Sequence, residues 1–344
     1  MKRINLFSVL CTAILALLVT SCHNQDAEFP DFGRTTVYFA YQFPVRTIVL
    51  GDDTYDTSLD NAHQCQIYAT MGGVYANKKK IDIDFSVDNS LCNNLLFTTG
   101  GAAVKAMPSN YYTLSGNKIS LDHSLMGCVG VQLTDAFFAD PLSLQNTYVI
   151  PLRMTKVANA DSILSGIPKV ANAARANSAL WDVQPKDFVL YCVKFINQYH
   201  ANYLRRGKDV ITLGSATTTN IRHNQYVEKD EVCSTSTVSL NAVQLPIKVV
   251  DGGGNTVACT LLLTFDSQGK CTVSSSTTGF TATGTGMFVK NGEKKSWGNV
   301  DRSAIYLNYN ITMGASGKSY QTNDTLVVRD RGVKMETFLP VNNN

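Results

Sequence analysis

The stretch Lys80-Ile81-Asp82-Ile83-Asp84-Phe85-Ser86-Val87-Asp88 decides the fold class of this chain, because its apolar and polar residues alternate. The alternation puts four apolar side chains on one face, namely Ile81, Ile83, Phe85 and Val87. A period of two is typical of an antiparallel strand that is buried on one face only. Carboxylates spaced two residues apart can serve acid–base chemistry. Here we interpret them as the solvated face of the strand.

Similar short strands recur on both sides of this stretch. They are residues 36–41, 65–69, 129–133 and 148–154, and the segments between them are rich in Gly, Asn and Asp. Several short strands at this spacing in about 120 residues are typical of a β-sandwich. We therefore predict an all-β chain whose residues 35–157 form an immunoglobulin-like β-sandwich.

The second half has a different pattern. Residues 158–180 are rich in Ala, Ser and Asn and are predicted to be a linker. An almost continuous apolar run, residues 187–197, is followed by strands joined by short turns, such as Asp266-Ser267-Gln268-Gly269. Consecutive antiparallel strands of this kind favour a meander, so residues 181–344 are predicted to be a lipocalin-like β-barrel.

The N-terminus has the layout of a lipoprotein signal. Lys2 and Arg3 precede an apolar run, residues 6–19, that is too short for an ordinary membrane span. Ser21, a small residue, precedes Cys22, which would carry the lipid. We predict a signal peptide over residues 1–21 and an extended tether over residues 22–34. The lipid on Cys22 would anchor the protein to the outer membrane. The signal by itself does not predict which side of that membrane the protein faces.

Charge and cysteine content argue against a nucleic-acid-binding protein and against a disulfide-rich protein. The chain has 30 basic and 27 acidic residues, so it offers no electrostatic footprint for nucleic acid. Seven cysteines follow Cys22, and neither their odd number nor their spacing indicates a disulfide framework. Cys259 and Cys271 flank a predicted hairpin, where they are either paired or, as we favour, buried free thiols.

The sequence carries no recognisable catalytic, metal or cofactor motif. Neither Gly-x-Ser-x-Gly nor His-Glu-x-x-His occurs, and the histidines are isolated. Asp135 and Asp140 flank Phe137-Phe138, and we interpret this pair as part of a loop anchored by the two phenylalanines rather than as glycosidase carboxylates. We therefore expect a protein without enzymatic activity, metal or cofactor.

A carbohydrate site needs aromatic rings for the apolar face of a sugar and polar groups for its hydroxyls. Trp297 is the first candidate because it lies in a polar predicted loop, and Trp181 is the second. The remaining candidates are aromatic and basic residues in loop-like clusters: Tyr111, Tyr112, Tyr199, Tyr203 and Arg205. For each of them the alternative role is packing in a core.

Five segments carry a resemblance to a known family. They begin with Tyr41-Gln42-Phe43-Pro44-Val45-Arg46-Thr47 and Tyr68-Ala69-Thr70-Met71-Gly72-Gly73-Val74-Tyr75, and the others are residues 108–112, 133–141 and 203–209. The chain resembles two-domain lipoproteins of unknown function from gut Bacteroidetes. In them an immunoglobulin-like domain, also found in surface endoglycosidases, precedes a lipocalin-like domain.

The resemblance implies a role in handling surface glycans, beside an outer-membrane transporter of a polysaccharide-utilisation system. It assigns no activity and no binding residues. Two short segments are also similar to the O-glycosylation motif of exported proteins in these bacteria, with Ser162 and Thr325 as the acceptors. Of these, Ser162 is the better candidate because it lies in the predicted linker.

Together these observations predict a non-catalytic surface lipoprotein that binds a polysaccharide or oligosaccharide for uptake. One alternative is a structural or adhesive protein that binds a protein partner, which predicts a large apolar patch. The other is an undetected glycoside hydrolase, which requires two carboxylates facing each other across a cleft.

Overall fold

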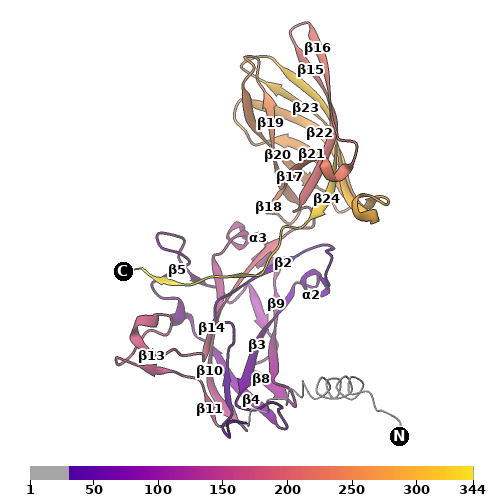
Figure 1. The fold of residues 1–344 in the computed structure, drawn as a ribbon. Coiled ribbons are helices and arrows are strands. Elements are labelled where there is room, and N and C mark those ends of the chain that lie inside the picture. Colours follow the sequence, from indigo (N-terminus) through magenta and orange to yellow (C-terminus); the bar gives the residue numbers. More distant parts are fainter. Residues whose placement is uncertain (1–30, 344) are drawn as a thin grey trace, which may run out of the picture.

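A computed structural model describes residues 31–343, and in them the chain is nearly all β, as predicted. Two domains follow one another, with the second stacked on one end of the first (Figure 1). The predicted signal peptide, Cys22 and most of the predicted tether lie outside the described residues. None of the helices in residues 31–343 is long and apolar enough to cross a membrane.

The first domain is a sandwich of two sheets. One sheet has the strand order β11-β1-β3-β9-β7, and the other has the order β25-β2-β14-β10-β4-β8, with β6 beside β10. Strand β25 (Glu336–Thr337) comes from the C-terminal end of the chain. The strands of the first domain are β1 (Thr36–Tyr38), β2 (Pro44–Val49), β3 (Gln64–Gly72), β4 (Lys80–Val87), β5 (Leu95–Leu96), β6 (Lys105–Ala106), β7 (Tyr112–Leu114), β8 (Lys118–Asp122), β9 (Met126–Leu133), β10 (Tyr148–Ala158), β11 (Ser162–Ile163), β12 (Ile167–Pro168), β13 (Trp181–Val183) and β14 (Phe188–Ile196). The short helices are α2 (Ser58–Asn61), α3 (Asp135–Ala139), η1 (Asn89–Cys92), η2 (Pro141–Leu144) and η3 (Ser178–Leu180).

Strand β4 has the two faces that its alternation predicts. Ile81, Ile83 and Phe85 are buried in the core of the sandwich. Asp82 and Asp84 are on the other face, where Asp82 accepts a hydrogen bond from Ser120 and Asp84 pairs with Lys118 at 3.4 Å. Only Val87, at the end of the strand, departs from the pattern, with 44% of its side chain exposed.

The predicted boundary at residue 181 is wrong. Strand β14, which the sequence pattern places in the barrel, lies instead between β2 and β10 in the second sheet of the sandwich. Its residues are buried on both faces, which explains the continuous apolar run. The predicted linker is also part of the first domain, because β11 pairs with β1 and β12 pairs with β13. The barrel begins with β15, at Asn202.

The second domain is a meander that closes on itself. From β19 to β24 each strand pairs with the next, and β24 pairs with β15. Closure comes from β17 and β18, which are separated only by Thr235: β17 pairs with β15 and β18 pairs with β19. The elements are β15 (Asn202–Leu213), β16 (Ala216–Arg222), η4 (Val227–Lys229), β17 (Glu231–Ser234), β18 (Ser236–Ser239), β19 (Ala242–Val250), β20 (Thr256–Phe265), β21 (Lys270–Ser275), β22 (Phe280–Glu293), η5 (Trp297–Asn299), β23 (Arg302–Met313) and β24 (Ser319–Asp330).

The cysteines of the described residues are all free thiols. In the hairpin of β20 and β21, Phe265 is opposite Cys271, and Cys259 is opposite Ile247 of β19. The register therefore keeps Cys259 and Cys271 apart, and both are buried in the core of the barrel. Of the two alternatives, the structure has the buried free thiols.

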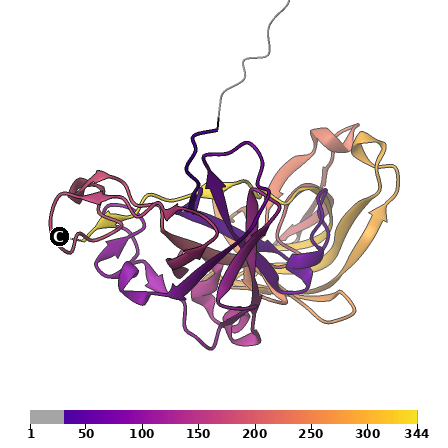
Figure 2. The same ribbon diagram turned by 90° about the horizontal axis from the view of Figure 1, so that it is seen from below.

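After the barrel the chain returns to the sandwich. Residues 331–343 run across the first domain, where β25 (Glu336–Thr337) pairs with β2 and β26 (Val341–Asn342) pairs with β5 (Figures 1 and 2). Arg331 fixes the start of this segment. Its guanidinium donates hydrogen bonds of 2.7 to 3.0 Å to the carbonyl oxygens of four residues: Leu50, Asp52, Asn197 and His200. This one buried side chain therefore links the C-terminal segment to the first domain and to the connection between β14 and β15.

Candidate functional site

Most of the aromatic residues that the sequence suggested as ligand platforms are buried. Trp181 is 6% exposed, and its indole nitrogen donates to the carbonyl oxygen of Ala174. Tyr112 is 8% exposed in the core of the sandwich. Tyr111 is partly buried, and its hydroxyl donates to Asp140 at 3.0 Å. These side chains hold loops against the core, so the expectation that they form a binding surface is not met.

The cluster that begins at Tyr199 is also internal. Tyr199 stacks on Phe265 with 3.7 Å between ring centroids, and the hydroxyl of the fully buried Tyr203 donates to the carbonyl oxygen of Tyr199. Arg205 is 5% exposed and pairs with the buried Asp324 at 2.9 Å. All three belong to the interior of the barrel. A sequence rich in aromatic, amide and basic residues looks like a loop, but β15 begins inside it.

Trp297 is half-buried at the edge of the barrel. The guanidinium of Arg302 lies 3.8 Å from the centre of its ring, and its indole nitrogen donates to the carbonyl oxygen of Val328 at 3.3 Å. One face of the ring is therefore already occupied by a cation. The predicted modification sites differ too: Ser162 is exposed on β11, whereas Thr325 is partly buried within β24, between β15 and β23.

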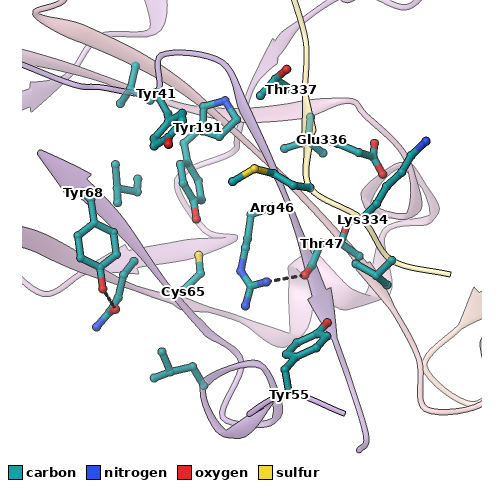
Figure 3. Close-up of a pocket in the computed structure, with 18 residues that line it drawn as sticks. Tyr41, Arg46, Thr47, Tyr55, Cys65, Tyr68, Tyr191, Lys334, Glu336 and Thr337 are labelled. Atoms are coloured by element: carbon teal, nitrogen blue, oxygen red, sulfur yellow. Dashed lines mark hydrogen bonds between the residues drawn. The ribbon is translucent and has the colours of Figure 1, made fainter. Parts of the chain in front are cut away.

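A cleft of about 540 Å³ lies elsewhere, at the open side of the sandwich. We call it the tyrosine cleft, after its most prominent side chains (Figure 3). Its walls come from β2, β3, β14, the segment around α2 and the C-terminal segment. The lining residues are Tyr41, Pro44, Val45, Arg46, Thr47, Tyr55, Leu59, Cys65, Gln66, Ile67, Tyr68, Val189, Tyr191, Val333, Lys334, Met335, Glu336 and Thr337.

The cleft exists because two sheet edges are incompletely paired. Strand β1 pairs with β3 only over Thr70, Met71 and Gly72, so within the described chain the preceding residues of β3 pair with β9 alone. Strand β25 likewise pairs with β2 only at Pro44 and Val45. The gap between the two sheets stays open at this point, and the buried Cys65 and Tyr191 form its floor.

Three exposed tyrosines surround this gap. Tyr41, Tyr55 and Tyr68 have 65%, 45% and 47% of their side chains exposed, which is unusual for large rings that line a concave surface. Tyr68 projects from β3, and its hydroxyl donates to the side-chain oxygen of Gln66 at 2.6 Å. The rings therefore present free faces, with hydroxyl and amide groups at their edges.

Arg46 provides fixed hydrogen-bond donors inside the cleft. Its guanidinium pairs with the buried carboxylate of Asp60 and donates to the carbonyl oxygen of Thr47 at 3.0 Å. Asp60 also accepts from the backbone N–H of Val49 at 2.9 Å. Burial raises the pKa of Asp60, although its bonds to Val49 and Arg46 oppose the rise. The arginine is a third exposed, so its remaining N–H groups are open to the cleft.

The C-terminal segment forms the wall opposite β3. Glu336 is held by Lys194 of β14 at 2.9 Å, while Met335 is 85% exposed and Lys334 is exposed beside it. Glu336 is the one carboxylate among the lining residues. Burial raises the pKa of the Cys65 thiol to about 12, which keeps it protonated.

These features define a two-domain, all-β protein with an aromatic cleft at the side of its sandwich. Residues 32–161 match a family model described as an N-terminal domain, and residues 198–332 match a domain of unknown function, DUF5627. The crystal structure of a Bacteroides ovatus protein of unknown function is 43% identical, with a TM-score of 0.87, over 90% of this chain and 99% of that chain. The chain therefore belongs to the same family as this protein.

A second structure is similar in a much weaker way. It is described as an auxiliary nutrient binding protein from Bacteroides thetaiotaomicron VPI-5482, and it is 11% identical with a TM-score of 0.34, over 85% of this chain and 95% of that chain. No structural argument follows from a superposition of that kind. No curated protein matches the chain.

Sequence reasoning missed the tyrosine cleft for a physical reason. The candidates predicted from the sequence are aromatic residues in loop-like segments, whereas Tyr68 is on a strand and Tyr41 lies just before one. Both occur in the segments that carry the family resemblance. One feature of the sequence could have indicated the cleft. Tyr68 is at an outward position of an alternating strand, and the neighbouring strand β1 is too short to cover that strand along its whole length.

Proposed function

We propose that this protein is a non-catalytic, lipid-anchored protein of the bacterial cell surface that binds an oligosaccharide in the tyrosine cleft. The observation that carries the proposal is the group of three exposed tyrosines around a cavity of about 540 Å³. Cavities of about 300–1,000 Å³ are the usual size for small-molecule ligands. The lipid anchor rests on the predicted signal peptide, residues 1–21, which precedes Cys22.

The chemistry of the walls suits a sugar chain. Tyrosine rings stack on the apolar face of a sugar, and their hydroxyls bond its rim. Arg46 and Gln66 supply donors and acceptors for hydroxyl groups, and the incomplete pairing of β3 leaves backbone groups beside them. The combination of free rings and fixed polar groups is what distinguishes the cleft from the candidates chosen from the sequence.

A binding role fits this cleft better than hydrolysis does. Glycoside hydrolysis uses two carboxylates about 5–10 Å apart, on either side of the scissile bond. Among the residues that line the cleft only Glu336 is acidic, and it is held by Lys194. Asp60 is buried behind Arg46 and is 1% exposed.

Affinity electrophoresis of the purified protein against plant, host and microbial polysaccharides tests the proposal. We expect one class of glycan to retard the protein and the Tyr68→Ala variant to bind about tenfold more weakly, since a stacked ring contributes about 1.4 kcal/mol. Tyr75→Ala is the matched control, because Tyr75 is 63% exposed in the same domain but does not line the cleft.

Retardation that is equal for the Tyr68 and Tyr75 variants would place the binding site elsewhere. The Trp297→Ala variant checks the site that the sequence suggested, and we expect it to bind like the wild type. If no glycan retards the protein, the exposed Met335 and Leu59 beside the tyrosines favour the alternative of a protein partner. A pull-down from outer membranes, with and without Tyr68→Ala, would then identify it.

A further inference from the structure

The barrel of the second domain has an opening in its wall. Along β15, the neighbouring strand changes from β17, which pairs with residues 202–205, to β16, which pairs with residues 207–213. On the other side, β18 pairs with β19 only as far as Gln244. In the described residues, β19 beyond Gln244 therefore pairs with β20 alone. We call the gap between β16 and β19 the lateral slot.

A cavity of about 190 Å³ lies in the lateral slot. It is bounded at one end by Tyr320, whose hydroxyl donates to the carbonyl oxygen of Val250 at 2.7 Å and accepts from its N–H at 2.9 Å. The volume corresponds to about six water molecules and is below the usual range for larger ligands. It suits one small molecule rather than a chain.

The inner wall of the slot is a buried network of charges. Arg205 donates to Asp324 at 2.9 Å, and Arg222 bridges Asp324 at 2.6 Å and Asp209 at 2.7 Å. The hydroxyls of Tyr309 and Thr322 donate to these two carboxylates. Gly207 makes the bridge possible, because a Cβ there would collide with the carboxylate of Asp324.

The side chains that line the cavity carry more positive than negative charge. Four of them are cationic, namely Arg205, Arg222, Lys248 and Lys318, and two are carboxylates, Asp209 and Glu231. Two further carboxylates lie outside the lining, Asp324 behind the arginines and Asp251 beside Lys318. The surface of the cavity itself therefore has an excess of positive charge, which the outer carboxylates offset only from behind. In a partly enclosed site, such an excess attracts an anion.

One donor of this network also has no partner. Nη1 of Arg222 is buried and makes no hydrogen bond with the described residues. A buried donor that lacks an acceptor costs about 1–3 kcal/mol. An acceptor held in the cavity, which Arg222 lines, would offset this cost.

From these observations we propose that the lateral slot is a second binding site, which takes a single small organic carboxylate. Its carboxylate group is held by Arg222 and by the lysines at the rim, and the rest of the molecule lies against Tyr309, Tyr320 and Ile247. The carboxylate comes either from a free hydroxy acid or from a single uronic acid. This site is independent of the tyrosine cleft and of the function proposed for it.

The test uses two probes of nearly the same shape, L-lactate and L-lactamide, of which only lactate carries a negative charge, and follows their binding to the purified protein by saturation-transfer NMR. We expect lactate to bind and lactamide to bind at least tenfold more weakly. Displacement of lactate by D-glucuronate would assign the slot to a uronic acid, and binding of lactate without displacement would assign it to a free hydroxy acid. Binding of neither carboxylate, or equal binding of lactate and lactamide, would overturn the proposal.

A pair of variants on β16 locates the probe. Asn220 lines the slot, so Asn220→Trp is expected to fill the entrance and lower lactate binding at least tenfold, without touching the charged network. Thr219 is its exposed neighbour and points to the opposite face of the strand, so Thr219→Trp should bind lactate like the wild type. Equal binding by both variants would contradict a site in the slot.

Discussion

The tyrosine cleft of the sandwich and the lateral slot of the barrel both lie where strand pairing is incomplete, but their walls differ. Around the cleft, Tyr41, Tyr55 and Tyr68 are exposed, and their rings contribute little to any core. Around the slot, Arg205 and Asp324 are almost completely buried and bonded to each other. The cleft can therefore change without loss of the fold, whereas the slot is part of what holds the barrel together.

The largest expected effect tests the structural role of the slot. Asp324→Ala leaves Arg205 and Arg222 buried without their shared partner, which should lower the free energy of unfolding of the barrel by about 3–5 kcal/mol. Urea unfolding, followed by Trp297 fluorescence in a Trp181→Phe background, measures it. Asp301→Ala is the control, because its pair with Lys294 is exposed and should matter by less than 1 kcal/mol. Similar losses of unfolding free energy in both variants would contradict the view that the slot helps to hold the barrel together.

The next effect depends on pH. Burial, together with the charges of Arg331 and Lys194, lowers the pKa of His200 from 6.5 to about 4. Between these two values the unfolded chain binds a proton that the folded chain does not, so stability should fall as the pH falls from 6.5 towards 4, by up to about 3 kcal/mol. Urea midpoints at pH 7 and pH 4.5 measure the loss. In His200→Asn the loss should shrink, and an unchanged loss would assign it to other groups.

Arg331 tests whether the wall of the cleft depends on the junction between the domains. Arg331→Ala removes a guanidinium that bonds four carbonyl oxygens, and we expect a loss of about 2–3 kcal/mol. Because residues 333–337 line the cleft, glycan binding should weaken as well. Thermal unfolding and affinity electrophoresis measure the two effects. Arg329→Ala, at a half-exposed neighbour, serves as control, and intact binding in Arg331→Ala would show that β25 holds the wall alone.

The smallest expected effect refines the account of the cleft. Tyr68→Phe keeps the ring but removes the hydroxyl that bonds Gln66, so glycan affinity should fall by only a few-fold, against about tenfold for Tyr68→Ala. Neither variant should lower the unfolding midpoint, since Tyr68 is about half exposed. A drop in the midpoint as large as that of Asp324→Ala would remove the distinction between cleft and slot.

Part of this architecture could be predicted from the sequence. The alternation in residues 80–88 predicts the two faces of β4, and the turn after residue 265 predicts the hairpin of β20 and β21. The apolar run of residues 187–197 does not indicate the domain boundary correctly. A strand that is buried on both faces shows no alternation, so nothing in its sequence says which sheet it joins.

The sequence by itself determined the all-β class and the buried role of Phe137 and Phe138. These follow from composition and from periods of a few residues. The tertiary structure alone decided that Tyr41, Tyr68 and the segment of residues 333–337 meet in one cleft, because they are brought together by strand pairing across almost the whole chain. It also decided that Tyr199, Tyr203 and Arg205 are internal, since exposure depends on what packs against a residue and not on its neighbours in sequence.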